Sequence, residues 1–128
     1  CDIPITFEKI LALVALIQAL VITIQNKNDY PNIHIQILES NKWQAARYGL
    51  KGKFIDPITF KQLTMIQAIE NLCSFVEPTI ISLGLKKYIK VIEDILIKGT
   101  GATIQRKLYK SSGNFKDMIR SLKDQFYQ

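Results

Sequence analysis

Residues 41–50 gather the side chains of this sequence that are best suited to binding an anion. They read Asn-Lys-Trp-Gln-Ala-Ala-Arg-Tyr-Gly-Leu and include the only Trp of the chain. In a helix, Trp43 and Arg47 share a face because they are four residues apart. The Arg47 guanidinium can donate two parallel hydrogen bonds to a carboxylate or a phosphate, and Asn41 and Lys42 are further candidates to bind the same group. The structural alternatives are a salt bridge for Arg47 and a packing role for Trp43.

A second candidate cation, Arg106, follows a Gly99-Thr100-Gly101 turn. Free N–H groups at the start of a helix can bind an anion, although a Gly-x-Gly turn between two helices also serves as a simple linker. Arg106 is therefore a candidate for phosphate or carboxylate binding, with a salt bridge between helices as the alternative. The sequence has no phosphate-binding loop, nucleophile elbow or metal-ligand motif, so we predict no catalytic residue and no metal ligand within it.

Composition indicates one domain over residues 1–128, with 48% apolar side chains available for a core. The net charge of +6 arises from 17 basic and 11 acidic residues. We interpret it as a solvated surface, with an anionic partner as the alternative. No nucleic-acid-binding signature is present, so no nucleic-acid partner is expected. Two cysteines are too few for a disulfide framework, which favours a cytoplasmic protein.

Residues 10–24 are almost entirely apolar, which predicts a helix that is hydrophobic on every side. Thr6 is its expected N-cap, with Ile5 and Ile10 as a hydrophobic staple. We expect this helix to be central and largely buried. The side chains that test its burial are those of Leu13, Leu16, Leu20 and Ile24. A membrane span is the alternative, but about 15 apolar residues fall short of the ~20 that a span needs, so no membrane partner is expected.

The segments that must position residues 41–50 are short. The β-branched stretch Ile33–Ile37 could form a strand or simply extended backbone. The motif itself is typical of a short helix that Gly49 ends, and an extended piece follows at residues 53–56. Thr59-Phe60-Lys61-Gln62 has the pattern of a capping box, so it predicts the start of a long helix.

The C-terminal half is expected to be helical throughout. Gly84 and Gly99 should end two successive helices. Two shorter helices are predicted at residues 102–110 and 115–126, the second of them capped by Asn114. Six helical segments with hardly any strand signal predict an all-α fold, a compact bundle of five to six helices with at most a short hairpin.

Three motifs follow one another along the chain. They are Cys1-Asp2 with Ile17-Gln18-Ala19-Leu20-Val21, then Glu39–Leu50 with Ile55-Asp56, and then Gly99–Ala102 with Gln105-Arg106 and Tyr109. Together these motifs resemble the C-terminal region of the carboxylate–amine ligase family, also called type-2 glutamate–cysteine ligases. Two positions depart from the pattern of that family. Ser40 separates the acidic residue from Asn41, and Gln44 stands where an Arg is usual, which removes a positive charge.

The resemblance implies that the chain is the helical flank of a larger, glutamine-synthetase-like α+β enzyme. Because the first residue is Cys1 rather than Met, we expect a C-terminal fragment of a longer protein. The missing N-terminal catalytic portion would contain the nucleotide-binding sheet and the metal ligands, and would be a partner of this fragment. Apolar surface left bare by its absence would favour self-association.

The resemblance also implies an activity that depends on ATP. Members of the family activate a substrate carboxylate with ATP and Mg²⁺ to an acyl phosphate, which an amine then attacks, and glutamate and cysteine are the best-known amino-acid substrates. We expect the fragment alone to be inactive and to hold no cofactor. In the intact enzyme, Arg47, Asn41, Lys42 and Arg106 are the candidates for substrate or phosphate binding. The alternative is a non-enzymatic helical module that binds a partner protein through an amphipathic face.

Overall fold

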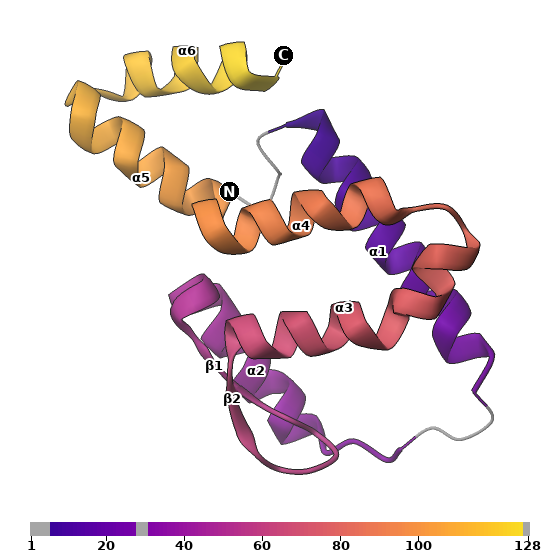
Figure 1. Ribbon diagram of the computed structural model, residues 1–128. Coiled ribbons are helices and arrows are strands. Elements are labelled where there is room, and N and C mark those ends of the chain that lie inside the picture. The colour runs from indigo at the N-terminus through magenta and orange to yellow at the C-terminus, as the bar shows by residue number, and fades with distance from the viewer. Residues whose placement is uncertain (1–5, 28–30, 127–128) are drawn as a thin grey trace. The chain divides into compact units, whose positions relative to one another are not determined.

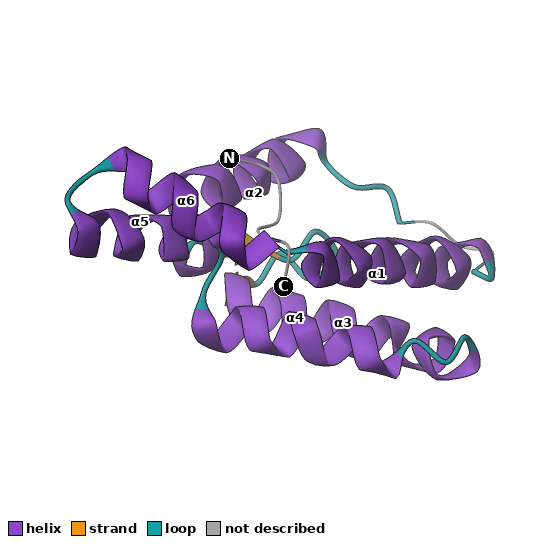
Figure 2. Cartoon of the chain, turned by 90° about the horizontal axis from the view of Figure 1, so that it is seen from above, coloured by secondary structure: helices purple, strands orange, loops and turns teal. Residues whose placement is uncertain are grey.

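The computed structural model describes residues 6–27 and 31–126, which form six α-helices, one short 3-10 helix and one pair of strands. In chain order the elements are α1 (Phe7–Gln25), α2 (Ile35–Tyr48), η1 (Gly49–Lys51), β1 (Lys53–Ile55), β2 (Gln62–Thr64), α3 (Met65–Ser82), α4 (Lys86–Lys98), α5 (Gly101–Ser112) and α6 (Phe115–Phe126). Helices dominate the described chain, and its strands are confined to one hairpin (Figure 1 and Figure 2). The predicted all-α fold class with at most a short hairpin is therefore confirmed.

Contacts between residues divide the chain into two compact units. The hairpin unit comprises Gln18–Leu83, and the helical unit comprises Cys1–Ile17 together with Gly84–Gln128. The first part of α1 belongs to the helical unit and the rest of α1 to the hairpin unit. That residues 1–128 act as a single domain stays a prediction.

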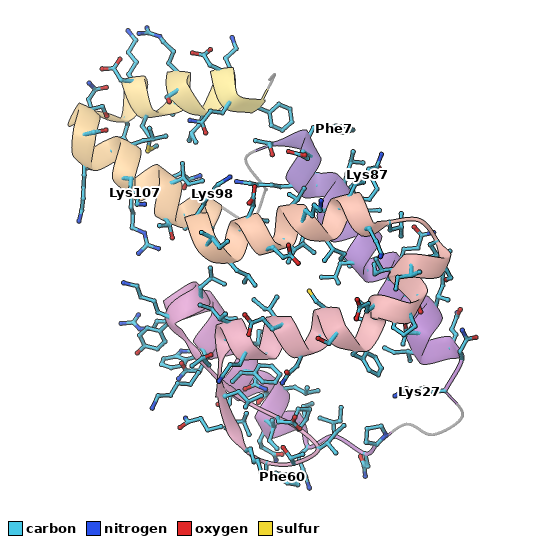
Figure 3. All side chains as sticks on the ribbon, in the orientation of Figure 1. Phe7, Lys27, Phe60, Lys87, Lys98 and Lys107 are labelled. Atoms are coloured by element: carbon cyan, nitrogen blue, oxygen red, sulfur yellow. The ribbon has the colours of Figure 1, made fainter. Side chains whose placement is uncertain are left out.

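The hairpin pairs β1 with β2 in antiparallel fashion. Phe54 lies opposite Leu63 at the centre of this short ladder. The extended piece expected at residues 53–56 is confirmed as a strand over Lys53–Ile55, whereas no strand was predicted at its partner, Gln62–Thr64. At the tip, Phe60 projects from the hairpin and has a φ of 57°, a conformation that is uncommon for a bulky residue (Figure 3).

The start of α3 differs from the prediction. The capping box is formed by Thr64 and Gln67: the Gln67 N–H donates to Thr64 Oγ1 at 3.1 Å, and the Thr64 N–H donates to Gln67 Oε1 at 3.0 Å. The box expected from Thr59 to Gln62 is wrong, because Thr59 lies in the hairpin loop and Gln62 in β2. The Thr-x-x-Gln pattern occurs twice within nine residues, and pairing with β1 keeps the first copy out of a helix.

The first turn of α2 also differs from the prediction. The stretch expected to be extended, Ile33–Ile37, enters the helix at Ile35, with His34 in the N-cap position. Alternation over so few residues did not distinguish a strand from a helical turn. At the other end, Gly49 stops the helix as predicted, with a φ of 56° that favours glycine.

The α1 helix is buried on one face only. Its buried side chains are the small ones of Ala12, Ala15 and Ala19. Of the four side chains chosen to test burial, Leu13 is exposed and the other three are half-buried. The expected burial on every side is therefore wrong for this chain, because alanines form the contact face and several larger apolar side chains point outward. The exposed large side chains of α1 are those of Phe7, Leu13, Val14, Ile17 and Val21.

Two further observations concern α1. The Lys9 N–H donates to Thr6 Oγ1 at 3.3 Å, so the predicted N-cap is confirmed, whereas the staple residue Ile5 lies outside the described residues. Among the described residues, α1 is the one helix whose length and composition would allow it to cross a membrane. Core helices of other proteins and signal sequences share these properties, so this finding does not identify a membrane protein.

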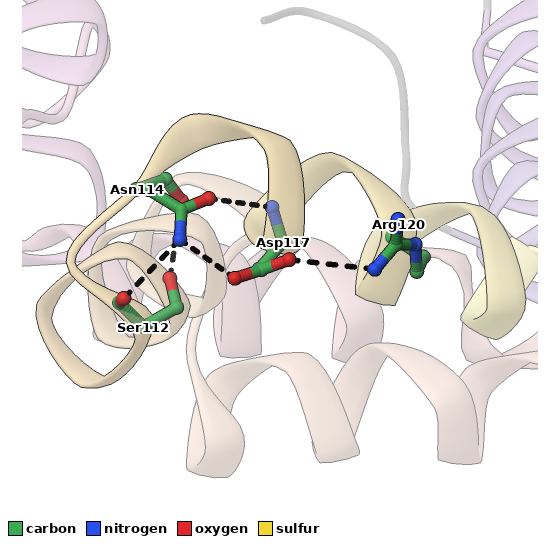
Figure 4. Close-up of polar contacts among 4 residues, drawn as sticks. All are labelled: Ser112, Asn114, Asp117 and Arg120. Atoms are coloured by element: carbon green, nitrogen blue, oxygen red, sulfur yellow. Dashed lines mark hydrogen bonds and ion pairs between the residues drawn. The ribbon is translucent and has the colours of Figure 1, made fainter.

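Caps define the ends of the helices in the helical unit. Gly99 ends α4 and Gly113 ends α5, the latter in the left-handed conformation. Asn114 caps α6 as predicted: its Oδ1 accepts from the Asp117 N–H at 2.9 Å, and its Nδ2 donates to Asp117 Oδ2 at 2.6 Å (Figure 4). These contacts are local, so they stabilise the turn between α5 and α6 rather than a distant contact.

Candidate functional site

Asn41 joins α2 to the hairpin. Only 8% of this residue is exposed, and its amide exchanges two hydrogen bonds with the backbone of Ile55. Asn41 Nδ2 donates to Ile55 O at 2.7 Å, and the Ile55 N–H donates to Asn41 Oδ1 at 2.8 Å. The amide of this candidate is thus engaged by the protein's own backbone rather than facing a site for a ligand.

Gln44 makes a second contact from the same side of α2. Its Oε1 accepts a hydrogen bond from the Lys53 N–H at 3.2 Å. An Arg, which the resembling family usually has at this position, carries donors only and could not accept this bond. The helix and the loop also approach closely at Gly52, where a Cβ atom would lie 2.9 Å from Gln44 O. These contacts explain how α2 is held beside β1.

Two of the cations that the sequence singled out also lie on α2. Lys42 and Arg47 are exposed, and neither side chain forms a hydrogen bond or ion pair with another described residue. Trp43 is 55% exposed and meets Tyr48 edge to face, with ring centroids 5.6 Å apart. Trp43 therefore packs on a neighbouring aromatic ring while leaving much of its own surface uncovered.

Arg106 belongs to the helical unit. Its Nε donates to Ala102 O at 3.1 Å, which lays the side chain along α5. It lines a groove between α5 and α6 whose wall includes the rings of Tyr109 and Phe115, with centroids 4.5 Å apart. Because Arg106 and Arg47 lie in different units, each is considered as a separate candidate.

Asp56 has a role that the sequence did not reveal. Its Oδ1 accepts hydrogen bonds from the Ile58 N–H at 2.8 Å and the Thr59 N–H at 2.9 Å. The bonds from Thr59 and Ile58 hold the pKa of Asp56 below its ordinary value. An Asp followed by a turn residue such as Pro57 is a signal for such a loop cap, and the carboxylate shapes the hairpin loop.

Metal-ligating side chains do not come together in the described part of the chain. No group of three or more His, Cys, Asp or Glu residues is found there that could hold a metal ion. The described residues therefore do not fit a Mg²⁺ site.

The chain belongs to glutamate–cysteine ligase family 2 (GCS2), whose pattern it matches over residues 1–125. It is 34% identical over 126 residues to a Gloeobacter violaceus protein named "Putative glutamate--cysteine ligase 2", and this match covers 95% of the chain and 34% of that protein. A protein of the same name from Solibacter usitatus is 31% identical over 123 residues, covering 93% of the chain and 32% of the relative. A third protein of this name, from Herpetosiphon aurantiacus, is 29% identical over 126 residues, covering 95% of the chain and 33% of the relative.

These matches confirm the family that the motifs resembled. The chain spans about a third of the length of the curated relatives it matches. A glutamate–cysteine ligase-like family is thus established for this chain, and it is a family of ligases.

Proposed function

We propose that this chain is the C-terminal part of an ATP-dependent carboxylate–amine ligase that forms an amide bond through an acyl phosphate. The observation that carries the proposal is the outward face of α2 in a member of this family. There Arg47 stands exposed without a described partner, on a helix that Asn41 anchors to β1. Such a face suits recognition of a carboxylate or a phosphate.

The proposed reaction assigns distinct roles to the candidate cations. A substrate carboxylate, that of glutamate in the first instance, is activated to an acyl phosphate, and the nitrogen of an amine such as cysteine then displaces phosphate. The Arg47 guanidinium would orient the carboxylate or the transferring phosphoryl group, with Lys42 adding positive charge nearby and Arg106 as a second, separate candidate. ATP and Mg²⁺ would be bound in the intact enzyme mainly by the portion absent from this chain.

The same proposal covers the state of the isolated chain. Without the N-terminal catalytic portion it should be inactive, and its exposed apolar side chains should promote self-association. We place the intact enzyme in the cytoplasm, acting on small amino-acid substrates and not on nucleic acid or at a membrane. A module that only binds a partner protein through these exposed faces is the competing function.

Enzyme assays separate these functions. Phosphate release should be measured for the longer protein that contains this chain, and for residues 1–128 alone, with ATP, Mg²⁺, glutamate and a panel of amines. We expect release from the longer protein only when both a carboxylate and an amine are present, and none from residues 1–128. A longer protein that folds but never releases phosphate under these conditions would overturn the ligase and favour the binding module.

A further inference from the structure

β1 has two edges, and only one of them is paired with a strand. On the β2 side, the Met65 N–H donates to Gly52 O at 3.1 Å and the Asp56 N–H donates to Lys61 O at 2.9 Å. Alternate residues of an antiparallel strand direct their backbone groups to opposite edges. Lys53 and Ile55 therefore direct their N–H and C=O groups to the edge of β1 that β2 leaves free.

Two side chains of α2 cover that free edge. Ile55 exchanges both of its backbone hydrogen bonds with the Asn41 amide, at 2.7 and 2.8 Å, just as two residues of neighbouring antiparallel strands do. Gln44, three residues further along the helix, accepts from the Lys53 N–H at 3.2 Å. An amide side chain offers the same donor and acceptor as a peptide group, so α2 supplies three of the bonds that a third strand would make.

We infer that Asn41 and Gln44 are positioning residues that set the rotation of α2 and thereby the direction in which the exposed Arg47 is presented. This inference rests on the proposed function for the role of Arg47. At about 100° per residue, Trp43 lies about 200° around the helix from Asn41, and Arg47 about 240°. Measured from Gln44, Trp43 lies about 100° and Arg47 about 60° around the helix, so Arg47 stands next to the Gln44 contact. The bonds of Asn41 and Gln44 to β1 therefore fix the rotation of α2 at which both Trp43 and Arg47 are exposed. Asn41 acts through Arg47 and does not itself bind substrate.

Amide hydrogen exchange in the 128-residue chain tests the hydrogen bonds directly. Asn41→Leu, similar in size but without polar atoms, should raise the exchange rate of the Ile55 amide about tenfold or more. Gln44→Met should do the same for the Lys53 amide, whereas Gln44→Glu, which keeps an acceptor, should leave it slow. Ser40→Ala, an exposed neighbour on α2, is the control. Unchanged exchange at Ile55 in Asn41→Leu and at Lys53 in Gln44→Met would overturn the inference.

Kinetics of the longer protein test whether these bonds act through Arg47. Gln44→Met should lower kcat/KM about fivefold in the presence of Arg47, and should have no further effect in an Arg47→Ala background. With Arg47 present, Gln44→Glu should keep kcat/KM close to that of the unmodified protein. An equal loss in both backgrounds would contradict the positioning role. Absence of activity from the unmodified protein would overturn the proposed function and this role with it, while the exchange experiment would still decide whether the side chains replace a strand.

Discussion

The hairpin unit and the helical unit hold their elements in place by different means. In the hairpin unit, some side-chain hydrogen bonds join residues far apart in the sequence, as between Asn41 and Ile55, or between the hydroxyls of Thr23 and Thr79 at 2.7 Å, in addition to local ones. Those described on α4, α5 and α6 join residues two to four positions apart. Long-range bonds fix one element against another, whereas local bonds stabilise single helices and turns. The exposed Arg47 thus stands on an anchored element.

Charge and exposed apolar surface distinguish the two units as well. The helical unit contains 11 basic and 6 acidic residues, a net charge of +5, whereas the hairpin unit contains 6 and 5, a net charge of +1. On α6 of the helical unit, the exposed apolar side chains of Phe115 and Ile119 lie next in sequence to the cations of Lys116 and Arg120. Most of the net positive charge of the chain therefore belongs to the helical unit.

Loss of the Asn41 amide should produce the largest change in stability. Asn41→Leu would leave the Ile55 N–H and C=O groups without partners, which should lower the free energy of unfolding by about 3 kcal/mol. Urea-induced unfolding followed by the fluorescence of Trp43, the only Trp and a member of the hairpin unit, measures this effect. A loss below about 1 kcal/mol would show that the contact is no stronger than a local one.

Removing the cap of α6 should cost less and act locally. Asn114→Ala removes the acceptor for the Asp117 N–H and should destabilise α6 by about 1 kcal/mol. Far-ultraviolet circular dichroism should show reduced helicity on mild heating, while the Trp43 fluorescence transition stays where it was. If the Trp43 fluorescence transition of Asn114→Ala shifted as much as its helicity transition, the two units would unfold together. The difference drawn above between the hairpin unit and the helical unit would then not hold.

The hairpin loop should respond to pH through Asp56. The folded-state pKa of Asp56 is depressed, so its contribution to stability is present above the unfolded value of about 4 and is lost as the pH falls through the lower folded value. Asp56→Asn keeps an acceptor for the Thr59 N–H but cannot titrate. Below about pH 4, the unmodified chain should therefore lose more hairpin-unit stability than this variant does. If the stability of the unmodified chain and that of Asp56→Asn fell equally as the pH was lowered, the stabilising role assigned to the Asp56 carboxylate would be contradicted.

The smallest effect on folding is expected on the outer face of α6. Ile119 is 60% exposed, so Ile119→Ser should change the stability by no more than about 0.5 kcal/mol. The same substitution should reduce any self-association, because it removes apolar surface from that face. Light scattering and unfolding of the same sample measure both quantities. A stability loss above about 1 kcal/mol would show that Ile119 is covered in solution.

Much of the fold followed from local chemistry, and the failures have a common cause. The caps predicted at Gly49, Gly99 and Asn114 were correct because a cap depends on the residues next to it. The helix start at Thr59 failed because strand pairing with a distant segment overrode a local pattern that occurs twice. Burial of α1 was overestimated because periodicity shows how apolar a face is and not how much chain is available to cover it.

The candidate site shows the same division. An Arg at helical spacing from a Trp could be found from sequence, and both lie on the outward side of α2. The position of Asn41 in the same motif suggested a ligand contact, but its partner is a backbone group 14 residues away. The residue type allows both uses, so only the packing of α2 on β1 could decide between them.

The most direct test of the account is the steady-state turnover of ATP by the longer protein that contains this chain, with Arg47 present or replaced. With glutamate and an accepted amine, Arg47→Ala should lower kcat/KM about a hundredfold, and Arg47→Lys should restore only part of it, because Lys cannot bind a carboxylate or phosphate bidentately. Unfolding of each variant must first show matched stability. Near-normal turnover in both variants would contradict the account and leave Arg47 a surface residue.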